Sequence, residues 1–189
     1  MHKSIVVIVF CISLFAIVPV SSAHTVSGVE VPDQINVNGT SLILNGAGMR
    51  EKFFFDIYVA ALYLPKAVHT TEAVLASPGP RRVLMHFVYK EVGRDKLVEG
   101  WNEGFEDNLT KEQLAVLRKR IDAFNALFDT VKRGDVVLLD YAPDSGTTVS
   151  INNHQRGTIP GKDFNDALLR IWLGDEPVTQ SLKHELLGQ

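Results

Sequence analysis

The strongest constraint on the fold lies in residues 45–64, where two glycines and an arginine precede a long run of strand-favouring apolar residues. Gly46 and Gly48 predict a tight turn, because glycine adopts backbone conformations that other residues avoid. Residues 53–64 are apolar at both odd and even positions, so a strand here presents apolar side chains on both faces of a sheet. Such a strand must be covered on both sides or must line a cleft.

Three polar side chains accompany this run. Arg50, Asp56 and Tyr58 fall on one face if the two-residue alternation is unbroken. A guanidinium at the mouth of an apolar strand can hold a carboxylate through two parallel hydrogen bonds, and a phenol can add a third. The residue types alone favour a plainer interpretation, in which Arg50 forms an ion pair with Asp56 or Glu51 and Tyr58 belongs to the core.

The first residues are typical of a targeting signal. Lys3 precedes an apolar stretch at 5–18, and small residues lead up to Ala23, which predicts a signal peptide over 1–23 and a mature domain over 24–189. The apolar stretch is shorter than the roughly 20 residues that span a bilayer. We expect an exported protein without a membrane span, in the periplasm if the host is a Gram-negative bacterium. Cys11, the one cysteine, lies in the signal, which excludes disulfides and thiolate sites from the mature chain.

Charge and motifs exclude several function classes. The net charge of -3, with both signs spread along the chain, provides no basic field for nucleic acid. Zinc-protease, serine-hydrolase, P-loop and dinucleotide-binding motifs are absent from the sequence, and we predict no metal and no cofactor. His86 lies in a strand pattern and could act as a base, but an isolated histidine is more often structural.

Strands and helices alternate in blocks. Asn38-Gly39 predicts a tight hairpin, and the residues from Thr110 to Gln113 have the form of a helix-capping box. Apolar residues at helical spacing occupy the middle and the end of the chain. The predicted strands are 26–31, 35–37, 41–44, 53–64, 83–89, 136–141 and 148–151, and the predicted helices are 71–76, 94–108, a second one from 110 to about 128, 163–172 and 179–187. This order predicts an α+β domain with a largely antiparallel sheet covered on one face by helices.

Residues 45–64 also resemble the entry strand of the chalcone isomerase-like superfamily, in which a glycine-glycine-arginine turn leads into a strand that ends near a tyrosine. Further blocks resemble the C-terminal signature of the bacterial exported branch of that superfamily, namely 133–135, 141–143, 157–161 and 164–175. The resemblance implies an open-faced β-sandwich, with a large antiparallel sheet, a layer of helices and a ligand cleft between them.

The superfamily includes plant enzymes that cyclise chalcones, fatty-acid binders and proteins without known catalysis. Arg50 matches an arginine that lies near the ligand in all three, and Tyr58 matches a tyrosine that helps the fatty-acid binders hold a carboxylate. Asn102 matches an asparagine of the plant enzymes. Asp95 stands where those enzymes have a tyrosine, and Ile171 where they have a threonine or serine. These departures imply that chalcone cyclisation is absent.

Three functional hypotheses follow. The first is a cell-envelope protein that binds a small apolar carboxylic acid, such as a fatty acid, through Arg50, Tyr58 and Asn102. In this hypothesis Phe54, Trp101 and Phe105 are candidates for lining the apolar part of the pocket. The second is an intramolecular lyase or isomerase acting on an enone-type substrate, with Arg50 stabilising negative charge. The third is a structural or interaction protein whose cleft is closed by its own side chains, for example by an ion pair between Arg50 and Asp56.

Overall fold

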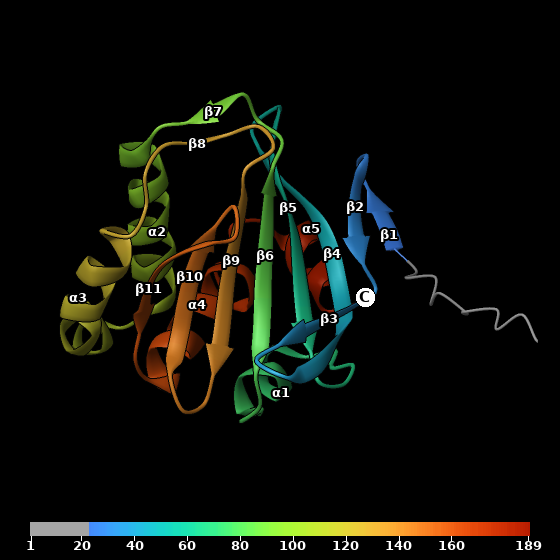
Figure 1. Cartoon of the computed structure of the whole chain (residues 1–189). Helices are drawn as coiled ribbons and strands as arrows, with labels where there is room; N and C mark the ends of the chain where they lie inside the picture. Colours follow the sequence, from blue (N-terminus) through green and yellow to red (C-terminus); the bar gives the residue numbers. More distant parts are fainter. Residues whose placement is uncertain (1–22) are drawn as a thin grey trace, which may run out of the picture.

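A curled seven-stranded antiparallel sheet dominates the computed structural model, which describes residues 23–189 (Figure 1). The strand order is β11-β10-β9-β6-β5-β4-β3. The predicted signal peptide lies outside the described residues apart from Ala23, so it stays a prediction. The strands are β3 Gln34–Val37, β4 Thr40–Lys52, β5 Phe55–Leu64, β6 Arg81–Phe87, β9 Val136–Ala142, β10 Gly146–Ile151 and β11 His154–Ile159.

Helices cover one face of this sheet, as predicted. Helix α4 packs against the sheet and α2 packs against α4, while α3 lies against α2 and the edge strand β11 (Figure 1). The capping box of α3 is confirmed. The backbone N–H of Gln113 donates to the Thr110 hydroxyl at 3.3 Å, and the backbone N–H of Thr110 donates to the Gln113 side-chain oxygen at 2.9 Å. The helices are α1 Thr71–Ala76, α2 Arg94–Asn108, α3 Lys111–Asn125, α4 Lys162–Leu173 and α5 Gln180–Leu186.

A small hairpin covers part of the opposite face and explains why β5 is apolar on both sides. The hairpin consists of β1 Ala23–Val26 and β2 Val29–Pro32. Alternate residues of β5 enter two separate cores, with Ala60 and Leu62 facing the helices and Val59 and Ala61 facing the hairpin side. On the hairpin side the Tyr63 hydroxyl donates a hydrogen bond to the Pro32 carbonyl at 2.9 Å.

The predicted turn at Gly46 and Gly48 is wrong, because both residues lie inside β4. Helix α5 packs directly onto them: a Cβ atom on Gly46 would lie 2.0 Å from the Glu185 carbonyl oxygen, and one on Gly48 would lie 1.7 Å from the Glu185 carboxylate. The glycines therefore give the helix room to approach the strand. The chain turns instead at residues 53–54, where Phe53 has a φ of +59°, an unusual value for a bulky residue.

Two other turns agree with the sequence. Asn38 and Gly39 have φ angles of +50° and +82°, as a tight hairpin turn between β3 and β4 requires. Asn152 and Asn153 also have positive φ angles, which asparagine adopts more readily than most residues, and they form the turn between β10 and β11. The strand that follows, β11, was not predicted, because its residues are mostly polar and exposed at the sheet edge. A short pair, β7 Glu91–Val92 and β8 Val131–Lys132, lies at one end of the molecule (Figure 1).

The end of the domain that carries α1 is closed by a buried arginine. Arg81 is only 1% exposed; its Nε donates to Asn165 Oδ1 at 2.6 Å and its Nη1 donates to the Val74 carbonyl at 2.8 Å. The same guanidinium forms an ion pair with Asp166, which also accepts from Lys162 Nζ at 2.6 Å. These bonds tie β6, α1 and α4 together.

Candidate functional site

A cleft of about 710 Å³ lies between the opposite end of the sheet and the helices. The β4–β5 turn, the ends of β5 and β6, and β7 form its sheet side, while α2, the last turn of α4 and the segment after α4 form its helix side. Its volume falls within the roughly 300–1,000 Å³ typical of small-molecule sites. Much of its wall is apolar, including Ile57, Met85, Phe87, Leu97, Ile171 and Val178.

Arg50 and Tyr58 lie together on the sheet wall of this cleft. They are direct cross-strand partners on β4 and β5, and both line the cavity. Tyr58 is 8% exposed, and its hydroxyl accepts a hydrogen bond from Trp172 Nε1 at 3.0 Å. The half-buried Arg50 donates through Nη1 to the Glu51 carbonyl. The structure brings these two residues together, and their contact with a ligand stays a prediction.

Asp56 does not share that wall, contrary to the simple alternation. Arg50 pairs with Tyr58 and Glu51 pairs with Asp56, which leaves Ile57 without a partner in β4. This β-bulge breaks the alternation, so that Ile57 and Tyr58 both line the cleft while Asp56 borders a separate hollow. Within residues 23–189, no ion pair joins Arg50 to a carboxylate. The described residues therefore lack the ion pair between Arg50 and Asp56 that would have favoured a closed cleft.

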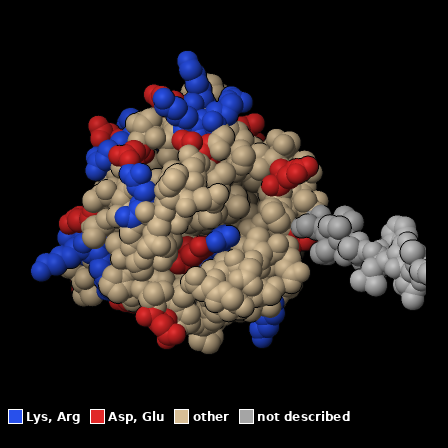
Figure 2. All heavy atoms as spheres, in the orientation of Figure 1, with Lys and Arg blue, Asp and Glu red and all other residues tan. Residues whose placement is uncertain are grey.

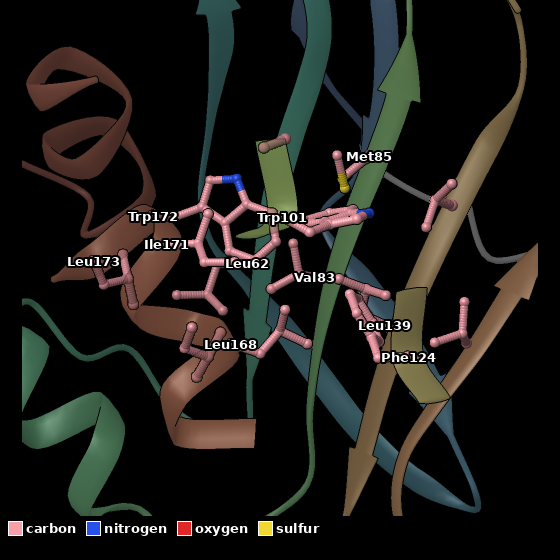
Figure 3. Packing of buried hydrophobic residues seen from close by; sticks show 14 of the residues in the cluster. Leu62, Val83, Met85, Trp101, Phe124, Leu139, Leu168, Ile171, Trp172 and Leu173 are labelled. Atoms are coloured by element: carbon pink, nitrogen blue, oxygen red, sulfur yellow. The ribbon is translucent and has the colours of Figure 1, made fainter. Parts of the chain in front are cut away.

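Trp101 lines the cleft from α2, as expected. Its ring packs edge-on against Trp172 with centroids 5.8 Å apart, and Figure 3 shows both indoles in the buried cluster with Met85. The indole is 3% exposed, and its Nε1 is buried without a hydrogen-bond partner in the described structure. A buried donor of this kind normally has an acceptor, so the Trp101 indole N–H is an exception within the described residues.

Two predicted lining aromatics lie elsewhere. Phe54 is 98% exposed in the β4–β5 turn and borders the outer hollow, because the turn falls at 53–54 and carries Phe54 away from the strand. Phe105 is fully buried beneath the cleft, where it packs against Phe164 with ring centroids 6.0 Å apart. Neither side chain lines the cavity.

Asn102 also lies outside the cleft, although the family resemblance implied a place at the ligand. The cleft face of α2 runs through Lys96, Gly100 and Gly104, at the four-residue spacing of one helix face. Asn102 points away from this face and accepts a hydrogen bond from Asn125 of α3 at 2.8 Å. Asn102 therefore joins the two helices, and the prediction that it binds a ligand is not supported by its position.

Several residues of the cleft were not found from the sequence. Met85 and Phe87 alternate on β6, and that two-residue spacing is the signal that could have placed them on the helix-facing side. Trp172, which donates to the Tyr58 hydroxyl, lies at the end of the predicted helix 163–172 and was not among the predicted site residues. No sequence signal links it to Tyr58, because the two residues meet only after α4 packs on β5.

The interior of the cleft carries hydrogen-bond donors. Burial raises the pKa of Tyr58 above its ordinary value, although the bond from Trp172 and the charge of Arg50 both lower it. The phenol therefore keeps its proton at neutral pH, and that proton is available for donation because Trp172 occupies the oxygen as an acceptor. The guanidinium of Arg50 adds further donors. Carboxylates line only the exposed rim, at Glu91, Glu103, Asp107 and Glu176.

Two other features are absent from the described part of the chain. Residues 23–189 contain no group of three or more histidine, cysteine, aspartate or glutamate residues placed to hold a metal ion. The same residues include no helix that is both long and apolar enough to cross a membrane.

An antiparallel sheet with one helix-covered face and a cleft between the two layers defines an open-faced β-sandwich. A family model described as chalcone isomerase-like matches residues 23–188. The chain therefore belongs to the chalcone isomerase-like family, and the predicted family and fold class are confirmed.

A solved structure supports the fold assignment. A fatty-acid binding protein from Arabidopsis thaliana superposes with a TM-score of 0.64 at 15% sequence identity, over 85% of this chain and 92% of that chain. At this identity the likeness shows a shared fold. A comparison with curated protein sequences found no match.

The structure also places the two residues that the resemblance matched to catalytic positions of the plant enzymes. The side chain of Asp95 is 99% exposed and lies outside the cleft. The apolar residue Ile171 lines the cleft.

Proposed function

We propose that this protein binds a small apolar carboxylic acid, such as a fatty acid, in the cleft between sheet and helices. One observation carries the proposal: the half-buried Arg50 and the Tyr58 hydroxyl lie together on the wall of a largely apolar cleft, and within residues 23–189 no carboxylate pairs with Arg50 and no acceptor takes the Tyr58 proton. Leaving a buried donor unpaired costs about 1–3 kcal/mol. A ligand that brings acceptors therefore gains affinity.

The charge of Arg50 favours a carboxylate over a neutral acceptor. A hydrogen bond to a charged group contributes about 1.5–3 kcal/mol, roughly twice the value for a neutral pair. The apolar wall formed by Met85, Phe87, Leu97 and Ile171 suits a hydrocarbon chain. The fatty-acid binding activity named for the Arabidopsis protein of the same fold is consistent with this ligand class.

We also propose that the protein does not cyclise chalcones. That reaction in the plant enzymes uses a phenol on the helix, and here Asp95 occupies the matching position and points to solvent. The apolar Ile171 replaces a hydroxyl at a second position. An isomerase or lyase acting on a different enone would still need Arg50, so turnover assays on enones distinguish this alternative from simple binding.

Export is part of the same proposal. The basic, apolar and small-residue segments of residues 1–23 support removal of a signal peptide and action in the cell envelope, in the periplasm of a Gram-negative host. N-terminal sequencing of the protein purified from the envelope fraction of its host tests this point. A mature N-terminus at His24 is expected, and a cytosolic protein that retains Met1 contradicts it.

Fatty-acid titration of the mature protein tests the binding function. Both tryptophans of the chain, Trp101 and Trp172, lie at or beside the cleft, so their intrinsic fluorescence reports occupancy. We expect palmitate to change this fluorescence with saturation and methyl palmitate to bind about tenfold more weakly, because the ester lacks the charge that Arg50 recognises.

Arg50→Ala should lose about tenfold or more in palmitate affinity, since it removes a charged hydrogen bond. Arg118→Ala is the matched control, because Arg118 is a half-exposed arginine on α3 far from the cleft lining. The proposal fails if fatty acids of several chain lengths leave the fluorescence and the melting temperature unchanged, or if Arg50→Ala binds palmitate as the wild type does.

A further inference from the structure

Three consecutive phenylalanines project from the turn between β4 and β5. Phe53 is 85% exposed, Phe54 is 98% exposed and Phe55 is 55% exposed. Isolated apolar side chains are common on protein surfaces, but three large ones in sequence at the tip of a hairpin form a patch. Phe53 also has a positive φ, which glycine or asparagine would adopt with less strain. An exposed phenyl group at a strained position points to a partner for the tip.

Basic side chains surround this tip. Lys52 precedes it, Arg133 borders the same hollow as Phe54, and Lys90 follows Tyr89, whose ring packs edge-on against Phe55 at 5.5 Å. Figure 2 shows Lys and Arg gathered, with a smaller number of Asp and Glu among them, at the end of the molecule where Figure 1 places β7, β8 and the β4–β5 turn. The chain as a whole has a net charge of -3, so this basic end stands out from the rest of the protein.

We propose that the tip of residues 53–55 docks on the surface of an anionic lipid bilayer. Aromatic side chains favour the interface between headgroups and acyl chains, and nearby lysines and arginines are attracted to anionic headgroups. This combination of an apolar tip and a basic surround matches a peripheral membrane contact. A protein partner would match the apolar tip equally well, but the positive charge at this end favours the anionic surface.

The cleft opens at the docking tip. Phe53 and Phe55 of the tip line the cleft, as does the neighbouring Lys52. Docking therefore places the cleft mouth at the lipid surface, where an apolar ligand could enter without crossing water. This consequence rests on the proposed function, whereas the docking itself rests only on the tip and its charges.

Vesicle sedimentation with the mature protein tests the docking. We expect the wild type to sediment with mixed phosphatidylcholine–phosphatidylglycerol vesicles, and to do so more weakly with pure phosphatidylcholine or in raised salt. Phe54→Ser should lower the partition coefficient between vesicles and water about tenfold, because it removes one inserted phenyl group. Val116→Ser is the matched control, since Val116 is a 73% exposed apolar residue on α3.

Phe54 does not line the cleft, so Phe54→Ser should bind palmitate as the wild type does. This separates the two proposals: palmitate binding can fail while vesicle binding persists, and the reverse. The docking proposal is overturned if the wild type ignores anionic vesicles, or if Phe54→Ser and the wild type sediment equally. It is also overturned if sedimentation velocity without lipid shows a dimer that Phe54→Ser abolishes, because the tip is then an interface between copies of this chain.

Discussion

Each end of the helix-covered sheet holds an arginine, and the two arginines differ in their hydrogen-bond partners. At the end that carries α1, Arg81 is 1% exposed and its donors go to Asn165, the Val74 carbonyl and Asp166. Its guanidinium also lies over the Tyr141 ring, 4.9 Å from the centroid. This arginine has protein partners on every side and joins three elements of the fold.

At the cleft end, the half-buried Arg50 makes one hydrogen bond to the carbonyl of the next residue and lies beside an apolar cavity. The same residue type therefore has different surroundings at each end. An arginine whose three nitrogens each bond a protein acceptor ties the fold together, whereas Arg50 beside the cavity keeps donors for the ligand that we propose. Substitutions at the two ends should separate stability from binding.

Arg81→Met is expected to have the largest effect. It leaves the Asn165 side chain and the Val74 carbonyl without their buried donor and removes a partner of Asp166, and breaking a buried ion pair costs about 3–5 kcal/mol. Urea unfolding of the mature protein measures this loss. Arg50→Met is the matched control and should change the free energy of unfolding by about 0.5 kcal/mol or less. Equal losses in the two variants would show that the comparison between the arginines is wrong.

Tyr58→Phe should have an intermediate effect at the cleft end. The phenyl ring keeps its packing against Phe87, but Trp172 Nε1 loses its acceptor, which costs about 1–3 kcal/mol for a buried donor. Urea unfolding again provides the measurement, and palmitate affinity should also fall. Tyr141→Phe is the control, because its ring can still lie under Arg81. A stability loss in Tyr141→Phe as large as that in Tyr58→Phe would contradict the importance of the bond between Tyr58 and Trp172.

Alkaline pH should have the smallest effect, on the side of the sheet away from the cleft. Burial raises the pKa of Tyr63 from its ordinary value of 10.0 to about 12. The folded state thus holds this proton more tightly than the unfolded state. The contribution of protonated Tyr63 to the free energy of unfolding is complete below pH 10 and is lost as the pH rises to about 12. Thermal melts across this range should show a decline that is shallower in Tyr63→Phe. An identical decline in both proteins would mean that other groups cause it.

Local features of the fold could be predicted from the sequence. The Asn38-Gly39 turn needs two positive φ angles, and the capping box of α3 needs only residues within one helical turn. The amphipathic pattern of α2 likewise identified the helix that carries Trp101. These features depend on neighbours in the sequence, so the amino-acid pattern is sufficient to find them.

The errors concern positions that only packing determines. Gly46 and Gly48 were interpreted as a turn because the approach of Glu185, far along the chain, is invisible in the sequence. The bulge at Ile57 moved Asp56 off the face that simple alternation assigned to it. A shift of one position around α2 is enough to turn Asn102 from the cleft towards Asn125.

The sequence by itself determined the family and the sheet-and-helix class, and it identified Arg50 and Tyr58 as neighbouring candidate site residues. Residue types and their spacing are sufficient for these inferences. Tertiary structure alone decided that Trp172 holds the Tyr58 hydroxyl and that Arg50 has no carboxylate partner in the described residues. It also decided that three phenylalanines stand exposed beside the cleft mouth. Contacts between distant segments form only when α4 and α5 pack on the sheet, and those contacts determine which side chains remain available to a ligand or a membrane.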